Sequence, residues 1–211
     1  MKISILPGLF FLVFTSVTLA FDRTMIAEQP EQVTPLLNGQ NIPAIELKTV
    51  DGETVGLTQL VAQKPTILVF YRGGWCPYCS RQLAGLKDIE SKLTDLGYQI
   101  IAISPDSPAR LQAQKVKSEF NVMLLSDDQL AATRAFGLAF FLPEKTAELY
   151  RNKLGVEFVD VYDTERVALP VPAVYIADQS GLIQFNYVNP NFKVRVSEQL
   201  LYDAAKTSLV K

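Results

Sequence analysis

The chain has 211 residues, 48% of them hydrophobic, which is enough to bury the core of one domain of ordinary size. Its 20 basic and 22 acidic side chains give a net charge of -2, so we expect no nucleic-acid partner. The chain has no histidine and only two cysteines, which excludes Ser-His-Asp and Cys-His catalysis and leaves too few ligands for a structural zinc site. We expect no metal and no cofactor.

The first 20 residues differ in composition from the rest of the chain. Met1 and Lys2 precede an uncharged, mostly apolar segment, residues 3–20, which ends in the small residue Ala20. This pattern predicts a secretory signal peptide over residues 1–20 and export to a periplasm, the exterior or a secretory lumen. The alternative is a membrane anchor formed by residues 3–20 without cleavage, and only in that case do we expect contact with a membrane.

After this segment, residues 21–34 predict an extended lead-in and residues 35–211 a single domain. Apolar alternation and short apolar runs predict strands at 45–50, 54–57, 66–71, 98–104, 122–125, 156–162, 173–178 and 182–188. Helical periodicity predicts helices at 76–96, 108–120, 128–136, 143–153 and 197–209. Because strands and helices alternate, we expect parallel pairing in the middle of the sheet, and the final hairpin makes the sheet mixed.

The segment Phe70–Cys79 joins a buried strand to a helix and contains the sequence Cys76-Pro77-Tyr78-Cys79. A helix N-terminus presents unpaired N–H groups and the positive end of the helix dipole, so a thiol at Cys76 is favoured as the reactive thiolate. Pro77 suits one of the first helical positions, where its missing N–H costs little. Cys79 follows about one turn later, so one sulfur can attack and the other can resolve the product.

Three structural interpretations compete with this redox pair. A purely structural disulfide between Cys76 and Cys79 closes a very short loop and constrains the unfolded chain little. A metal site lacks further ligands, and two core cysteines do not account for the preceding turn Gly73-Gly74. A CxxC pair at a strand-to-helix junction therefore favours thiol redox chemistry.

Two neighbours of Cys76 are further candidates. Trp75, the single tryptophan, is expected to be partly exposed and to contribute to a docking surface, with packing beside the loop as the alternative. Arg72 either lowers the pKa of Cys76 or steadies a peroxide oxygen, or it is an ordinary surface or salt-bridged arginine.

The Phe70–Cys79 segment resembles the peroxiredoxin-like branch of the alkyl hydroperoxide reductase/thiol-specific antioxidant superfamily. Shorter matches occur in the family's order at residues 51–52, 102–105, 125–127, 135–138, 142–144, 148–150 and 169–173. The resemblance implies a thioredoxin-like fold, an α/β domain with a central mixed sheet flanked by helices. It also implies reduction of peroxides or disulfides with a thioredoxin-type donor, Cys76 being the attacking and Cys79 the resolving cysteine.

The chain departs from this family in two places. Typical peroxiredoxins carry Thr or Ser where this chain has Gly73, and an arginine near the strand that here begins with Pro172, whereas residues 168–178 contain none. Arg72 or Arg134 is the candidate replacement. In thioredoxin-like proteins a cis-proline at the start of that strand faces the active cysteines, so we expect a cis Val171-Pro172 bond in contact with the pair.

The sequence thus predicts a thiol-dependent peroxidase of the peroxiredoxin-like type, re-reduced by a thioredoxin-type protein. Two alternatives stay open at this stage. One is a thiol-disulfide oxidoreductase that acts on protein disulfides, and the other is a non-enzymatic redox sensor.

Overall fold

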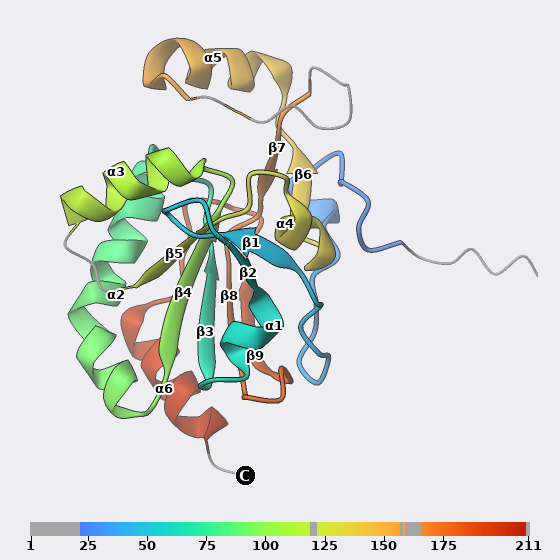
Figure 1. Cartoon of the computed structure of the whole chain (residues 1–211). Helices are drawn as coiled ribbons and strands as arrows, with labels where there is room; N and C mark the ends of the chain where they lie inside the picture. Colours follow the sequence, from blue (N-terminus) through green and yellow to red (C-terminus); the bar gives the residue numbers. More distant parts are fainter. Residues whose placement is uncertain (1–21, 119–121, 157, 159–165, 210–211) are drawn as a thin grey trace, which may run out of the picture.

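The computed structural model describes residues 22–118, 122–156, 158 and 166–209 (Figure 1). The predicted signal peptide and most of the predicted strand at 156–162 lie outside the described residues. Val156 and Phe158, which are described, do not belong to a strand. None of the helices in the described part of the chain has the length and apolar character needed to cross a membrane.

A seven-stranded mixed sheet forms the centre of the fold, with the strand order β2-β1-β5-β4-β3-β8-β9. Its strands are β1 (Glu46–Lys48), β2 (Thr54–Gly56), β3 (Thr66–Phe70), β4 (Gln99–Ser104), β5 (Met123–Ser126), β8 (Ala173–Ala177) and β9 (Ile183–Val188). The inner strands β3, β4 and β5 are parallel, whereas β8 pairs antiparallel with β3 and β9 antiparallel with β8. The predicted mixed sheet is therefore confirmed.

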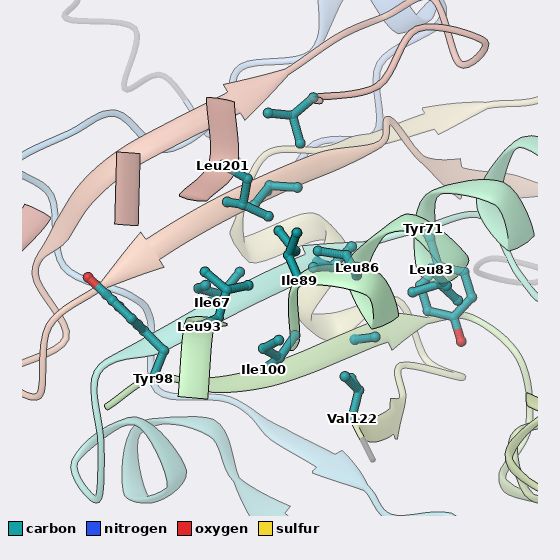
Figure 2. Close-up of a cluster of buried hydrophobic side chains, with 14 of the residues drawn as sticks. Ile67, Tyr71, Leu83, Leu86, Ile89, Leu93, Tyr98, Ile100, Val122 and Leu201 are labelled. Carbon is teal, nitrogen blue, oxygen red and sulfur yellow. The ribbon is translucent and has the colours of Figure 1, made fainter. Parts of the chain in front are cut away.

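Helices cover both faces of this sheet. One face packs against α2 (Pro77–Asp95), α3 (Pro108–Ser118) and α6 (Glu198–Ser208), and the other against α1 (Leu57–Val61) and α4 (Ala131–Ala135). Alternate residues of β3 divide between the two cores: Ile67 and Val69 face α2, and Leu68 and Phe70 face α4. Figure 2 shows the first of these cores, where side chains of α2 meet those of β3, β4 and α6.

A smaller unit stands apart from the main sheet. Strands β6 (Ala139–Phe141) and β7 (Ala168–Pro170) pair antiparallel and flank α5 (Glu144–Leu154), which Figure 1 shows at the top of the molecule. Its own core includes Phe140, Ala147 and Leu169, with Trp75 packed against it. The helix α5 was expected, but the two short strands and α1 were not.

The lead-in is attached to the domain rather than simply extended. It contains a short 3-10 helix, η1 (Pro30–Gln32), and its backbone is hydrogen-bonded to the segment around β6: Ala27 N–H donates to the Ala139 carbonyl and Thr34 N–H to the Gly137 carbonyl, both at 3.0 Å. The domain boundary near residue 35 stays a prediction.

Candidate active site

Cys76 is the N-cap residue of α2, directly after the loop that leaves β3. Its backbone is extended, with φ −88° and ψ 118°, and Pro77 opens the helix as predicted. The Cys76 carbonyl accepts hydrogen bonds from the N–H groups of Cys79 and Ser80, both at 3.0 Å. Both cysteines are free thiols, and they are buried, with exposed fractions of 2% for Cys76 and 0% for Cys79.

The two thiols differ in acidity. The hydrogen bond from the Cys79 thiol lowers the pKa of Cys76 to about 6, helped by the backbone N–H groups of Cys79 and Tyr78 and by the charge of Arg72, while burial opposes the shift. The same hydrogen bond and burial raise the pKa of Cys79 well above its ordinary value. Cys76 is therefore the thiolate near neutral pH, and Cys79 keeps its proton.

Arg72 is a buried residue, with an exposed fraction of 2%, so the interpretation as a surface arginine was wrong. Its guanidinium carbon lies 4.4 Å from the ring centroid of Phe192, 5.2 Å from that of Trp75 and 5.4 Å from that of Tyr150. Its Nε has no hydrogen-bond partner among the described residues. Aromatic faces attract a cation, so the three rings hold the positive charge of Arg72 beside Cys76. No carboxylate accepts a hydrogen bond from Nε among the described residues.

Arg134, the other arginine considered, lies in a different environment. It belongs to α4, and its Nε donates a hydrogen bond of 2.9 Å to the Thr24 carbonyl of the lead-in. Of the two arginines, it is Arg72 whose charge acts on Cys76.

The backbone at Gly73 explains one departure from the family pattern. Gly73 has φ 139°, a region that side chains rarely adopt, and a Cβ there would collide with the indole ring of Trp75. The next residue, Gly74, donates its N–H to Oδ2 of Asp106 at 2.7 Å. A threonine at position 73 is incompatible with this loop conformation and with the present position of Trp75.

Trp75 is half-buried, as expected, and packs against the α5 unit. Its ring centroid lies 5.1 Å from that of Tyr150 and 6.0 Å from that of Phe158. Trp75 also lines a groove of about 620 Å³, together with residues of α2 and α3 and with Leu154 of α5. The proposed docking role of Trp75 stays a prediction.

Pro172 lies at the predicted edge of the sheet, but its peptide bond is trans. The residue after it, Ala173, pairs with Phe70, so Pro172 lies beside the end of β3 from which the active-site loop leaves. No cis peptide bond occurs in the described part of the chain, and the prediction of a cis bond was wrong. The chain passes from β7 to β8 without a tight turn, with Val171 N–H donating to the Leu138 carbonyl at 2.9 Å, and trans is the intrinsically favoured isomer of an X-Pro bond.

Arg195 is a site residue that the sequence did not predict. It lies between β9 and α6, and its Nη2 donates to Sγ of Cys79 at 3.5 Å across a sequence separation of 116 residues. No motif marks this arginine, because the segment around it follows neither a strand nor a helix pattern.

The chain is similar in sequence to proteins of one family. The sequence profile of the AhpC/TSA family matches residues 38–186. Peroxiredoxin Bcp of Escherichia coli strain K12 is 33% identical over 106 residues, which are 50% of this chain and 67% of that protein. Chloroplastic peroxiredoxin Q of Populus jackii is 28% identical over 151 residues, or 72% of this chain and 60% of that protein.

Solved structures confirm the fold. Reduced Prx3 of Vibrio vulnificus has a TM-score of 0.64 at 18% identity, covering 81% of this chain and 99% of that protein. Peroxidoxin BcpB of Mycobacterium tuberculosis has a TM-score of 0.62 at 17% identity, covering 82% and 95%. The predicted thioredoxin-like fold is thus confirmed. Since the family profile matches residues 38–186, which include both cysteines and most of the central sheet, the chain belongs to the AhpC/TSA family of peroxiredoxin-like proteins.

Proposed function

We propose that this protein is a thiol-dependent peroxidase of the peroxiredoxin-like type. The observation that carries the proposal is the contrast between the two cysteines at the start of α2. Cys76 has a pKa of about 6 and lies near the charge of Arg72, whereas Cys79 keeps its proton within hydrogen-bond reach of Cys76. This arrangement supplies one nucleophile and one resolving thiol.

The reaction proceeds in two steps. The Cys76 thiolate attacks the terminal oxygen of a hydroperoxide, the O–O bond breaks, and the leaving alkoxide or hydroxide takes up a proton to become an alcohol or water. Cys76 is then a sulfenic acid. The Cys79 thiolate attacks that sulfur, the S–O bond breaks, and the hydroxide released becomes water while the Cys76–Cys79 disulfide forms.

A dithiol donor closes the cycle by reducing this disulfide, and we assign the role to a thioredoxin-type protein. Support comes from the family, whose members this chain resembles, and from the half-buried aromatic residues Trp75 and Tyr78 beside the cysteines. We further propose that the protein is exported, on the evidence of the uncharged segment 3–20 alone.

A second candidate function is thiol-disulfide exchange with protein substrates. The observation in its favour is the compact Cys76-Pro77-Tyr78-Cys79 motif at a helix N-cap, with Pro172 at the same sheet edge. The first step then attacks a disulfide sulfur and gives a mixed disulfide at Cys76 in place of a sulfenic acid.

One experiment separates the two functions. The reduced protein is mixed with hydrogen peroxide, with an organic hydroperoxide and with a model disulfide, and the single Trp75 reports the oxidation of Cys76 by fluorescence. We expect the second-order rate constant with at least one peroxide to exceed that with the disulfide by more than tenfold. A larger constant with the disulfide would replace the peroxidase with the exchange enzyme.

A further inference from the structure

Arg195 lies between β9 and α6 with buried hydrogen-bond donors and a contact with Cys79. Its side chain is half-buried, and its Nε and Nη1 atoms are fully buried without a hydrogen-bond partner among the described residues. The contact found for the guanidinium is the one from Nη2 to Sγ of Cys79, at 3.5 Å. Buried donors without partners cost free energy, so this placement calls for an explanation.

A neutral thiol is a poor acceptor for such a group. A sulfur that carries a proton accepts only weak hydrogen bonds, whereas a thiolate forms charge-assisted bonds that are roughly twice as strong as neutral ones. The guanidinium of Arg195 is therefore better matched to an ionised Cys79 than to the protonated Cys79 of the reduced enzyme.

We propose that Arg195 is a catalytic residue of the resolving step, in which its guanidinium stabilises the Cys79 thiolate as it attacks the sulfenic acid at Cys76. The inference rests on the proposed peroxidase function. It divides the two arginines between the two sulfurs: Arg72 acts on the thiolate that attacks the peroxide, and Arg195 on the thiolate that resolves the product.

The order of the two steps follows from the surroundings of Cys79. The ionisable groups that act there are Cys76 and the Tyr71 phenol on one side and Arg195 on the other, and the backbone of Arg72 adds a hydrogen bond to Cys79. In the reduced enzyme the Cys76 thiolate holds the Cys79 proton and raises the pKa of Cys79. Once Cys76 is a sulfenic acid, this negative charge is gone while the positive charge of Arg195 remains. Cys79 therefore ionises more readily at the step in which it attacks Cys76.

The test compares Arg195→Gln and Arg195→Lys with the wild type. An opposite charge at this range lowers a thiol pKa by about 1–3 units, so its removal reduces the thiolate fraction of Cys79 near neutral pH. The remaining thiolate is more basic and therefore more nucleophilic, which offsets about half of the loss in rate on a logarithmic scale. We therefore expect resolution to slow by about 3- to 30-fold near neutral pH in Arg195→Gln. Arg195→Lys should recover most of the rate, and the deficit should vanish at alkaline pH, where Cys79 ionises without help.

Single-turnover fluorescence of Trp75 separates the two steps, because attack depends on peroxide concentration and resolution does not. Trapping of the sulfenic acid followed by mass spectrometry identifies the intermediate. Attack should stay within about twofold of the wild-type rate in Arg195→Gln, since Arg72 serves that step. Lys193→Gln is the matched control, because it removes a positive charge from the same loop two residues away, and it should leave both steps unchanged.

The proposal is wrong if Arg195→Gln resolves at the wild-type rate at every pH, or if both steps slow equally with an unshifted pH profile. If the wild type forms no sulfenic acid, the peroxidase function fails, and a second measurement then decides the role of Arg195. In a Cys76→Ser background, alkylation of Cys79 should show a higher pH midpoint with Arg195→Gln than without it. Equal midpoints would overturn the role of Arg195 whatever the substrate.

Discussion

The guanidinium carbon of Arg72 lies 4.4 Å from the ring centroid of Phe192, so the loop before α6 covers the arginine that acts on the attacking cysteine. Trp75 comes from the active-site loop and Tyr150 from α5, and these rings complete an aromatic enclosure around the same guanidinium. Cation–π contacts contribute about 0.5–1 kcal/mol at exposed sites and about 2 kcal/mol when they are desolvated. Three separate segments thus keep one positive charge beside Cys76.

Replacing Arg72 should make Cys76 less acidic. Besides the hydrogen bond from Cys79, the charge of Arg72 lowers the pKa of Cys76, so we expect Arg72→Gln to raise that pKa from about 6. A rise of about 1–2 units lowers the thiolate fraction at pH 7 from roughly nine tenths to between about a half and a tenth. The rate of Cys76 alkylation measured against pH has a midpoint at the pKa of Cys76.

The control for this prediction is Arg81→Gln, which removes an arginine of α2 whose guanidinium carbon lies 5.7 Å from the ring centroid of Tyr78. It should leave the midpoint in place. An unchanged midpoint in a folded Arg72→Gln protein would show that the hydrogen bond from Cys79 accounts for the acidity of Cys76 without the arginine.

Gly73→Ala should destabilise the protein more than the same change at another glycine of left-handed conformation. Gly73 combines φ 139° with a collision between the new Cβ and the Trp75 indole. Gly97, with φ 91°, has open space where a Cβ would lie, with nothing within 4 Å, and the change there incurs backbone strain alone. Strain at such a residue costs about 1–3 kcal/mol, so urea denaturation should show the larger loss for Gly73→Ala. Equal losses would mean that Trp75 moves aside freely.

The reduced protein should become more stable as the pH rises from about 6 to 9. The folded pKa of Cys76 is depressed to about 6 from 9.0, so within this window the unfolded chain binds more protons at Cys76 than the folded protein does. The stability contributed by the Cys76 thiolate is fully present above the pKa of Cys76 in the unfolded chain. It is lost as the pH falls through the pKa of Cys76 in the folded protein. Above pH 9 the raised pKa of Cys79 acts in the opposite direction.

Thermal unfolding under reducing conditions tests this effect against Cys76→Ser. The melting temperature of the wild type relative to the variant should rise from pH 6 to pH 9. Asp127, whose burial raises its pKa to about 6, titrates at the lower limit of this window and is present in both proteins, so it cancels in the comparison. If the melting temperatures of the two proteins changed in parallel with pH, the depressed pKa of Cys76 would be contradicted.

The sequence predicts those parts of the site that depend on local chemistry. Pro77 and Cys76 define the start of α2 because a proline fits the first helical turn and an N-cap residue precedes it, and the apolar run of β3 marks a strand buried on both faces. Arg195 could not be predicted, because its contact with Cys79 depends on how the loop after β9 folds back. The same holds for β6 and β7, which are three residues each, and for the trans bond of Pro172, which depends on the path between β7 and β8.

The central claim is that Cys76 attacks and Cys79 resolves, and mass spectrometry of the two single variants after stoichiometric peroxide tests it most directly. Cys76→Ser should show no adduct at Cys79, because that thiol is fully buried, with an exposed fraction of 0%, and is shielded from the peroxide. Cys79→Ser should react once and stop as a sulfenic or overoxidised acid at Cys76. Oxidation of Cys79 in Cys76→Ser at close to the wild-type rate would contradict the account.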